Sequence, residues 1–487
     1  MKIRTVALHS LGCKVNTYET DVMKQLLSDA GYQIVPFEEK ADAYIVNTCT
    51  VTNIADRKSR QMLHRAKKQN PDSIVIAVGC YVQADTEHAL KEEGIDLCIG
   101  NNKKSEIVSL LAEYESVQKD REVQKDCDVQ EDTRDDGKPY KEELVKQQML
   151  QRKTLYGKAV TRIGQERNFE SMQLTQPVEH CRAFIKIQDG CNQFCSYCMI
   201  PYARGRVRSR KPEEVLEEIG NLSRQGYREF VITGIHLSSY GSEWEEADGI
   251  SKAGRFYDRY LLELLKQVSE LPGVRRIRLG SLEPTIVTEG FVQALTGIPK
   301  LCPHFHLSLQ SGCDETLKRM NRRYTTKEYA ESVALLRKYF EHPAVTTDVI
   351  VGFPGETEEE FECSRNFLEQ MNFFEMHVFK YSKRRNTPAA VMPGQLTEAQ
   401  KTARSEILLQ LTERQSEEYR RFYTGKTVEV LFEEKKEIKG VTYWIGHTPQ
   451  YVKVAVRSDC DLQNRIENVK GAENLLEDYL TGELCGN

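Results

Sequence analysis

Residues 183–198 read AFIKIQDGCNQFCSYC, an apolar run followed at once by three closely spaced cysteines. The apolar run is typical of a β-strand, and Cys191, Cys195 and Cys198 form a CxxxCxxC array. Three thiolates at this spacing can hold one corner of a cubane cluster and leave its fourth iron without a protein ligand. The alternative is a zinc knuckle, but structural zinc needs four ligands, and no fourth Cys or His follows at knuckle spacing. We therefore predict an iron–sulfur cluster here.

The chain after this strand alternates between further strands and helices. Strands are predicted at 229–233, 276–279, 305–309, 346–351 and 375–379, with helices such as 212–225, 259–270 and 326–339 between them. Six such units predict a partial barrel of parallel strands, in which chemistry lies in the loops at the carboxyl ends of the strands.

A second set of three cysteines lies in the N-terminal part of the chain. Predicted strands at 5–8, 43–46, 73–78 and 95–99, with helices at 20–30 and 55–68, are typical of a parallel α/β sheet. Cys13, Cys49 and Cys80 each follow one of these strands, and the carboxyl ends of parallel strands share one edge. We expect the three thiols to meet there and to hold a second cubane with an open iron. The alternative is three buried thiols that behave as small apolar side chains.

Composition limits the remaining possibilities. The 487 residues carry a net charge of −5, from 68 basic and 73 acidic side chains, so any binding to RNA must be local. Fourteen cysteines are too few for a disulfide scaffold. No window approaches the about 18 consecutive apolar residues of a membrane helix, and the first 25 residues have no apolar signal segment. We expect a cytoplasmic protein without membrane contact. Among the other eight cysteines only Cys181, ten residues before the array, is retained as a weaker candidate ligand.

The sequence thus predicts an α/β protein in five parts. They are a parallel α/β domain (1–115), a charged insertion or linker (116–176), a partial (β/α)6 barrel (177–407), a connecting helix (408–422) and a small all-β barrel (423–487). Residues 116–143 hold 6 basic and 10 acidic side chains and too few apolar ones to form a core. Alternating strands at 428–432, 441–445 and 451–456 predict the terminal barrel.

The CxxxCxxC array on such a barrel resembles the radical S-adenosylmethionine (SAM) superfamily. The three-domain order resembles that of the methylthiotransferase family within it, whose last domain is called TRAM. The motifs that carry the resemblance are Leu11-Gly-Cys-Lys-Val-Asn16, Asn47-Thr-Cys-Thr-Val51, Val78-Gly-Cys80, Gly190-Cys-Asn-Gln-Phe-Cys-Ser-Tyr-Cys198 and Ile200-Pro-Tyr-Ala-Arg-Gly205.

This resemblance implies a transferase with two [4Fe-4S] clusters and SAM as both methyl donor and radical source. The open iron of the N-terminal cluster then holds the sulfur that is transferred. It also implies a tRNA anticodon stem-loop as partner, a reductant such as flavodoxin or ferredoxin, and a sulfur donor; we expect a monomer. No catalytic residue is expected beyond the cluster ligands. Cofactor contacts are expected from loops after the later strands, against the alternative of ordinary turn chemistry, at Thr233, Gly234, Glu283, Gln310, Ser311, Gly352 and Glu356.

The residues after the first cysteine separate the branches of the family. Enzymes for isopentenyladenosine tRNA usually read Cys-Gln-Met-Asn, and those for a ribosomal-protein aspartate read Cys-Pro-Lys-Asn. Cys13-Lys-Val-Asn16 resembles instead the branch that acts on N6-threonylcarbamoyladenosine at tRNA position 37. The two other substrates stay open as alternatives, as does a non-catalytic, metal-containing RNA-binding protein.

Local basic runs bear on RNA binding. Arg204, Arg206, Arg208 and Arg210 lie in a stretch without an acid, and such clusters can neutralise phosphates. Two more runs follow later strands, at 318–323 and 380–385. The alternative is a solvated charged face. The terminal barrel has 8 basic and 11 acidic residues over 424–487, so its net negative charge does not favour binding to RNA phosphates.

Overall fold

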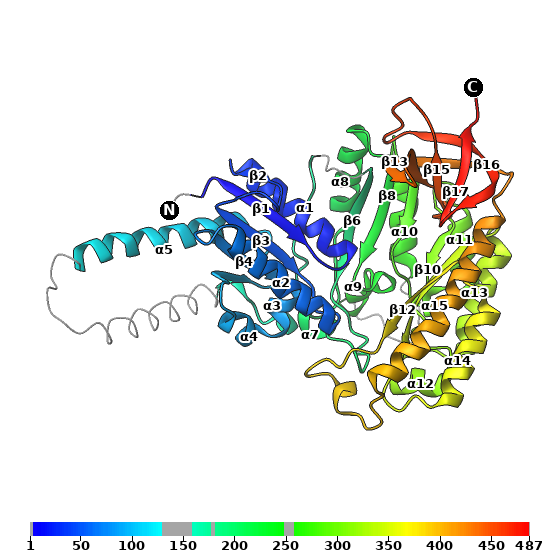
Figure 1. Ribbon diagram of the computed structural model, residues 1–487, viewed down its shortest axis with the longest axis horizontal. Coiled ribbons are helices and arrows are strands. Elements are labelled where there is room, and N and C mark those ends of the chain that lie inside the picture. The colour runs from blue at the N-terminus through cyan, green and yellow to red at the C-terminus, as the bar shows by residue number, and fades with distance from the viewer. Residues whose placement is uncertain (1–2, 129–157, 177–180, 248–257, 487) are drawn as a thin grey trace. The chain divides into compact units, whose positions relative to one another are not determined.

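The computed structural model describes residues 3–128, 158–176, 181–247 and 258–486 (Figure 1). The chain divides into two compact units. The N-terminal unit comprises Met1–Leu174 with Gly190–Asn192 and Cys198–Arg206, and the C-terminal unit comprises Thr175–Asp189, Gln193–Tyr197 and Val207–Asn487. The six-stranded barrel and the terminal β-barrel therefore belong to one unit, and the boundaries predicted for the five parts stay predictions. Among the described helices, none combines the length and apolar character that crossing a membrane requires.

The N-terminal unit is built on a parallel sheet of order β2-β1-β3-β4-β5. Its strands are β1 (Thr5–Ser10), β2 (Gln33–Val35), β3 (Ala43–Thr48), β4 (Ile74–Gly79) and β5 (Leu97–Ile99). Every residue of β3 and β4 is buried, because helices cover both faces of a parallel sheet. The four predicted strands are present, and the three-residue β2 escaped prediction because it is too short to show a period.

Helices connect these strands and extend beyond the predicted ranges. They are α1 (Lys14–Asp29), α2 (Asn53–Gln69), α3 (Cys80–Ala84), α4 (Thr86–Lys91), α5 (Ile107–Asp128) and α7 (Ile200–Arg204), with a 3-10 turn at Ile163–Gln165. The first part of the predicted charged insertion or linker is helical, because α5 continues to Asp128. Glu, Gln, Lys and Arg favour helix without needing a buried face. Residues 129–157 of the predicted linker lie outside the described residues.

The C-terminal unit contains the six predicted parallel strands. They are β6 (Arg182–Asp189), β8 (Glu229–Gly234), β9 (Arg276–Leu279), β10 (His304–His306), β11 (Ala344–Val351) and β12 (Glu375–Lys380). They form sheets of order β7-β6-β8-β9 and β10-β11-β12, joined by single parallel bridges such as Leu282 to Leu307. The short β7 (Arg208–Ser209) pairs antiparallel with β6. The predicted α/β fold class, with its partial barrel, is confirmed.

Helices cover the outside of this partial barrel. They are α8 (Pro212–Arg224), α9 (Ser242–Ala247), α10 (Asp258–Glu270), α11 (Glu289–Thr296), α12 (Asp314–Arg319), α13 (Thr326–Tyr339), α14 (Glu358–Met371) and α15 (Glu398–Arg421). Short 3-10 turns lie at Leu237–Ser239, Pro284–Ile286 and Pro388–Val391. Figure 1 shows α13, α14 and α15 side by side, and α15 packs against β12. The start of α15 is fixed by a capping box of Thr397 and Gln400.

A closed five-stranded barrel of order β13-β14-β15-β17-β16 ends the chain. Its strands are β13 (Thr427–Ile438), β14 (Val441–His447), β15 (Lys453–Val456), β16 (Ile466–Leu476) and β17 (Tyr479–Leu484). Val430, Phe432, Trp444, Val454 and Leu480 fill its core. The sequence did not predict β16 and β17, because few of their residues are buried and charged residues interrupt the alternation.

Two buried arginines at the amino ends of the barrel strands, Arg276 and Arg278, attach the terminal barrel through hydrogen bonds and an ion pair. Glu229, the first residue of β8, accepts from Arg278 Nε at 2.8 Å. The same guanidinium donates to Pro449 O at 2.9 Å, and Arg276 donates to Glu429 Oε1 at 2.8 Å. These contacts leave the carboxyl ends of the strands, where barrel chemistry lies, on the opposite side.

Candidate functional site

The N-terminal cysteines lie at the carboxyl ends of three neighbouring strands. Cys13 immediately precedes α1, Cys49 follows β3, and Cys80 begins α3 directly after β4. The three strands that precede these cysteines lie side by side in the sheet, in the order β1-β3-β4. Gly12 has φ +97°, and a Cβ atom there would lie 2.7 Å from the Cys49 sulfur. The structure thus brings Cys49 against the Cys13 loop, as the sheet topology predicted.

Burial and mutual charge raise the pKa values of two of these thiols, Cys49 and Cys13. Burial raises the pKa of Cys49 to about 12, and the charges of Cys80 and Cys13 add to the increase. The Cys13 side chain is open to solvent, yet protein surrounds it on the other sides and raises its pKa, and the charge of Cys80 adds to this. The thiols of Cys49 and Cys13, whose pKa values are raised, lose their protons readily only beside a positive charge, which bound iron supplies. The residues therefore fit a three-thiolate cluster site, and their role as ligands stays a prediction.

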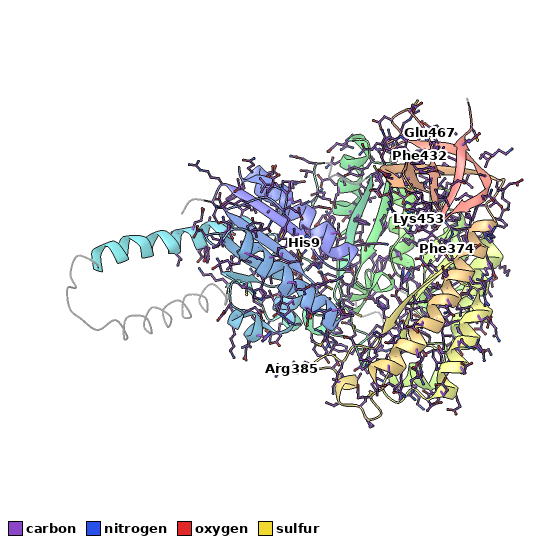
Figure 2. The ribbon with its side chains drawn as sticks, viewed as in Figure 1. His9, Phe374, Arg385, Phe432, Lys453 and Glu467 are labelled. Atoms are coloured by element: carbon purple, nitrogen blue, oxygen red, sulfur yellow. The ribbon has the colours of Figure 1, made fainter. Side chains whose placement is uncertain are left out.

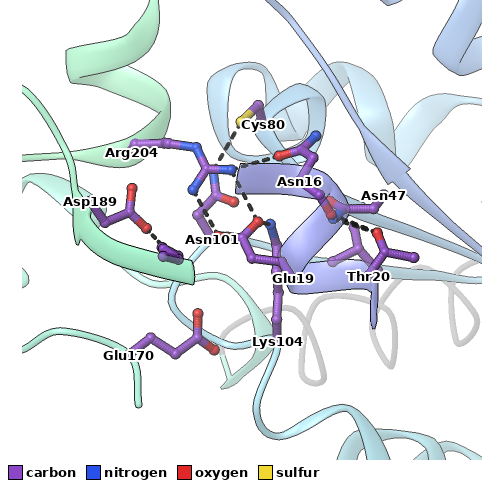
Figure 3. A network of polar contacts seen from close by, with 12 residues as sticks. Asn16, Glu19, Thr20, Asn47, Cys80, Asn101, Lys104, Glu170, Asp189 and Arg204 are labelled. Atoms are coloured by element: carbon purple, nitrogen blue, oxygen red, sulfur yellow. Dashed lines mark hydrogen bonds and ion pairs between the residues drawn. The ribbon is translucent and has the colours of Figure 1, made fainter. Parts of the chain in front are cut away.

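A buried polar network lies beside the N-terminal cysteines (Figure 3). The Glu19 carboxylate accepts from Arg204 at 2.8 and 3.0 Å and from Lys104. Arg204 also donates to Asn16 Oδ1 at 2.6 Å. Two cations around one carboxylate leave a net positive charge, and the charge of Arg204 favours the thiolate forms of Cys13 and Cys49.

Asn101 provides a direct contact with one of the sulfurs. Its Nδ2 donates to Cys80 Sγ at 3.5 Å and to Ala203 O at 2.7 Å. The bond to Ala203 O fixes the side-chain amide of Asn101 in the position from which it donates to the Cys80 sulfur. Hydrogen bonds to sulfur are among the factors that set the potential of an iron–sulfur cluster. Nothing in the sequence singled out Asn101 or Lys104, because only the fold brings them to this edge.

The prediction of an exposed basic run at residues 204–210 is wrong for three of its four arginines. Arg204, Arg208 and Arg210 are each at most 1% exposed. Arg204 belongs to the network above, Arg210 is paired with Glu218, and Arg208 lies 3.8 Å from Asp189. The pairing of β7 with β6 turns this stretch inward. Only Arg206 is exposed, and its contact with RNA stays a proposal.

Hydrogen bonds are present at each of the three CxxxCxxC cysteines. Within the N-terminal unit, the Cys191 amide donates to Gly205 O at 3.0 Å, and the Ile200 amide donates to Cys198 Sγ at 3.4 Å. Within the C-terminal unit, the Arg322 guanidinium donates to Cys195 Sγ at 3.2 Å. Donors and a cation at sulfur favour the thiolate that an iron ligand requires. Cys191, Cys195 and Cys198 therefore fit a cluster site. Cys181, the weaker candidate ligand, donates its thiol to Glu433 O.

A polar chain in the barrel connects to Cys195 through Arg322. Glu283 Oε1 lies 3.3 Å from Arg322, while its Oε2 accepts from Gln193 at 2.8 Å and contacts His236 Nε2 at 2.6 Å. Burial opposes ionisation of Glu283, but the His236 hydrogen bond and the charges of His236 and Arg322 hold its pKa at about 2. A permanent carboxylate thus holds the guanidinium at the sulfur. Sequence reasoning named Glu283 but missed His236 and Gln193, and placed Arg322 in a basic run for RNA.

The other predicted cofactor contacts occupy strand ends. Thr233 is buried, and a Cβ at Gly234 would lie 2.9 Å from Gln188 Oε1. Gln310 adopts φ +75°. Ser311 Oγ accepts from the Cys313 amide at 3.3 Å. Their cofactor contacts stay predictions.

Glu356 already has partners within the protein. Its Oε2 accepts from the Gly352 amide at 2.7 Å and from Arg404 at 2.6 Å. These two bonds order the loop after β11.

A row of three side chains across β10, β11 and β12 was not predicted. His306, Asp348 and His377 present ligand atoms within 4.8 Å of one another. Each lies on a different strand, separated from the next by about 30 to 40 residues of sequence. Only the strand register brings them together.

Comparisons with known proteins agree with this architecture. The profile of the radical SAM superfamily matches residues 185–368, and that of the uncharacterized protein family UPF0004 matches residues 5–100. Threonylcarbamoyladenosine tRNA methylthiotransferase MtaB of Bacillus subtilis (strain 168) is 37% identical over 96% of this chain and 93% of its own length. The MtaB protein of Aquifex aeolicus (strain VF5) is 35% identical over 90% and 95%.

A relative with another name is nearly as similar. The tRNA-2-methylthio-N(6)-dimethylallyladenosine synthase of Acetivibrio thermocellus is 32% identical over 96% of this chain and 88% of its own length. Among solved structures, radical SAM methyltransferase TsrM from Kitasatospora setae, with cobalamin and a [4Fe-4S] cluster bound, superimposes with a TM-score of 0.51. The match covers 80% of this chain and 77% of the TsrM chain. At 16% sequence identity it shows a shared fold and nothing more.

These matches exclude the non-catalytic alternative, because the relatives that span most of the chain are enzymes. SAM and a [4Fe-4S] cluster are the cofactors that the superfamily match brings to the CxxxCxxC barrel. From its two matched profiles and its identity to full-length relatives, the chain belongs to the radical SAM methylthiotransferase family.

Proposed function

We propose that this enzyme adds a methylthio group to C2 of N6-threonylcarbamoyladenosine at position 37 of tRNA. The observation that carries the proposal is the meeting of Cys13, Cys49 and Cys80 at one sheet edge, in a chain that has a separate CxxxCxxC barrel. A radical reaction alone needs one cluster. A second three-thiolate site supports the delivery of sulfur as well.

Two [4Fe-4S] clusters are the cofactors of this proposal, each held by three cysteines, together with SAM. When bound, these groups would supply the electron for SAM cleavage, the radical that activates C2, and the sulfur and methyl group that are transferred. The ligands are Cys191, Cys195 and Cys198 for one cluster and Cys13, Cys49 and Cys80 for the other.

The protein side chains prepare these sites electrostatically. Arg322 donates to Cys195 Sγ and is held by the Glu283 carboxylate, so a thiolate at Cys195 has a fixed counter-charge. Asn101 donates to Cys80 Sγ. The excess positive charge of the Glu19, Lys104 and Arg204 network offsets the negative charge that three thiolates bring.

The substrate assignment rests on the relatives and on one motif. Two of the most similar relatives are named for threonylcarbamoyladenosine, and Cys13-Lys-Val-Asn16 resembles the same branch. The partners proposed are the tRNA anticodon stem-loop, a reductant such as flavodoxin or ferredoxin, and a sulfur donor. A second candidate is dimethylallyladenosine tRNA, which the name of the Acetivibrio relative favours.

The test is to offer the reconstituted enzyme each modified stem-loop with SAM and a reductant. We expect the threonylcarbamoyladenosine stem-loop to gain one CH2S unit in nucleoside mass spectra, and the dimethylallyladenosine stem-loop to stay unchanged. The reverse result would assign the enzyme to the second candidate. Conversion of neither, by protein that carries about eight irons for two cubanes and cleaves SAM, would overturn the proposed function.

A further inference from the structure

His306, Asp348 and His377 form a His-Asp-His row across three neighbouring parallel strands. His306 Nε2 lies 3.3 Å from Asp348 Oδ2, and the His306 and His377 rings stack with centroids 5.8 Å apart. Asp348 and His377 are directly paired in the register of β11 and β12. The row is therefore fixed by rigid strands and not by loops.

The donor set suits a transition-metal ion. Two imidazoles and one carboxylate are the ligands of several zinc and non-haem iron sites. All three ligand atoms lie within 4.8 Å of one another. In a tetrahedral site with bonds of about 2.1 Å they would be about 3.4 Å apart, a distance that small side-chain rotations can reach.

Thr346 supports the orientation that a metal ligand needs. Its hydroxyl forms a hydrogen bond of 3.0 Å with His306 Nδ1. Metal-binding histidines use their second nitrogen for a contact of this kind, which fixes the tautomer and aims the first nitrogen. Here the first nitrogen, Nε2, is the one that faces Asp348.

One member of the row, His377, lies at an acidic groove. His377 is exposed, and it lines a groove of about 870 Å³ between β12, α15 and the terminal barrel. Phe374 and Lys453, labelled in Figure 2, also line it. The groove carries two basic side chains, Arg420 and Lys453, against five acidic ones, Glu375, Glu413, Glu417, Glu477 and Asp478. Such a charge balance attracts cations and repels phosphates.

We propose that His306, Asp348 and His377 bind one divalent transition-metal ion of the Zn2+ or Fe2+ class, separate from both cysteine sites. Imidazole ligands favour these ions over Mg2+ and Ca2+. Three protein ligands leave a coordination position open, which an oxygen of water or of a bound substrate fills. This site is independent of the proposed methylthiolation, so either conclusion can fail without the other.

The test compares zinc binding by the iron-loaded enzyme and its variants. Competition against a chromophoric chelator gives the zinc affinity, and elemental analysis gives zinc and iron per chain. We expect His377→Ala and Asp348→Asn to lose one zinc equivalent, with zinc affinity lowered at least 100-fold. The reason is that replacing even a residue that only hydrogen-bonds a metal ligand lowers metal affinity by about 10- to 100-fold. Thr346→Val should lower zinc affinity about 10-fold or more, because it removes the hydroxyl that bonds His306 Nδ1.

A matched control separates this site from ordinary surface histidines. His88 is an exposed histidine of α4 that pairs with Glu92, and His88→Ala should bind zinc as the unchanged enzyme does. Iron content should be the same in all variants, and Mg2+ should not compete. Equal zinc affinity in the unchanged enzyme, His377→Ala and Asp348→Asn would overturn the proposal, as would zinc uptake accompanied by an equivalent loss of iron.

Discussion

Gly12 decides how closely the first cysteine loop approaches Cys49. The residue needs φ +97°, and any side chain would meet the Cys49 sulfur and Cβ at 2.7 and 2.8 Å. Two separate demands, conformation and space, therefore fall on one glycine of the Leu11-Gly-Cys motif.

The substitution Gly12→Ala should remove the N-terminal cluster. We expect a loss of about four of about eight irons per chain, because the new methyl group displaces Cys49. Gly31→Ala is the control: Gly31 has φ +89°, and none of the described atoms lies within 4 Å of its would-be Cβ. It carries the same backbone strain of about 1–2 kcal/mol and should keep all its iron. Equal iron loss in both variants would attribute the effect to strain alone.

Cys49→Ala should separate the two halves of the reaction. It removes one of three N-terminal ligands, so methylthiolated tRNA should disappear while reductive formation of 5′-deoxyadenosine continues on the CxxxCxxC cluster. Chromatography of the nucleosides measures both products. Cys98→Ala, at a buried thiol of β5, should keep both activities. Methylthiolated product from Cys49→Ala would contradict the assignment of the N-terminal site.

At the scale of elements, the arginines between α7 and the end of β7 differ in burial. Arg206 is exposed, whereas Arg210 is buried and paired with Glu218. Gly205, with φ +74°, makes the turn between α7 and this stretch. A sequence of alternating arginines thus contains one candidate RNA contact and several internal ion pairs.

We expect Arg206→Ala to weaken tRNA binding and to reduce its salt dependence by about one counterion. Arg210→Ala should instead lower the free energy of unfolding by about 3–5 kcal/mol, because the fully buried Glu218 carboxylate loses the guanidinium with which it forms an ion pair. Filter binding at several salt concentrations and urea unfolding measure the two effects. An unchanged salt slope for Arg206→Ala would remove this stretch from the RNA-binding surface.

At the scale of the C-terminal unit, Glu229 holds Arg276 and Arg278, the two arginines of the partial barrel that bond the terminal β-barrel. Burial opposes its ionisation, but the charges and hydrogen bonds of Arg278, with Arg182 and Arg276, hold its pKa at about 2. A carboxyl with a lowered pKa stabilises the folded state above the ordinary value of 4.5, and this stability is lost as pH falls toward 2.

Glu229→Gln should therefore lower stability at pH 7 by on the order of 3 kcal/mol, and the loss should shrink as pH falls from 4.5 toward 2. Urea unfolding at pH 7 and pH 4 measures the difference. Glu429→Gln is the matched control, because Glu429 also pairs with Arg276 but is largely exposed, and it should cost less than about 1 kcal/mol. A pH-independent loss in Glu229→Gln would show that packing, and not the charge, matters at this position.

The sequence by itself determined the N-terminal parallel sheet, the partial barrel and the two cysteine sets. Strands such as β3 and β4 are apolar throughout, and βα alternation admits few topologies, so the meeting of Cys13, Cys49 and Cys80 followed from the order of elements. Only the tertiary structure decided which charged residues are buried and which distant residues share a site. Arginine looks the same in sequence whether it faces RNA or Glu218, because its partner lies on another element. The His306, Asp348 and His377 row depends on the register of three strands, which no local pattern encodes.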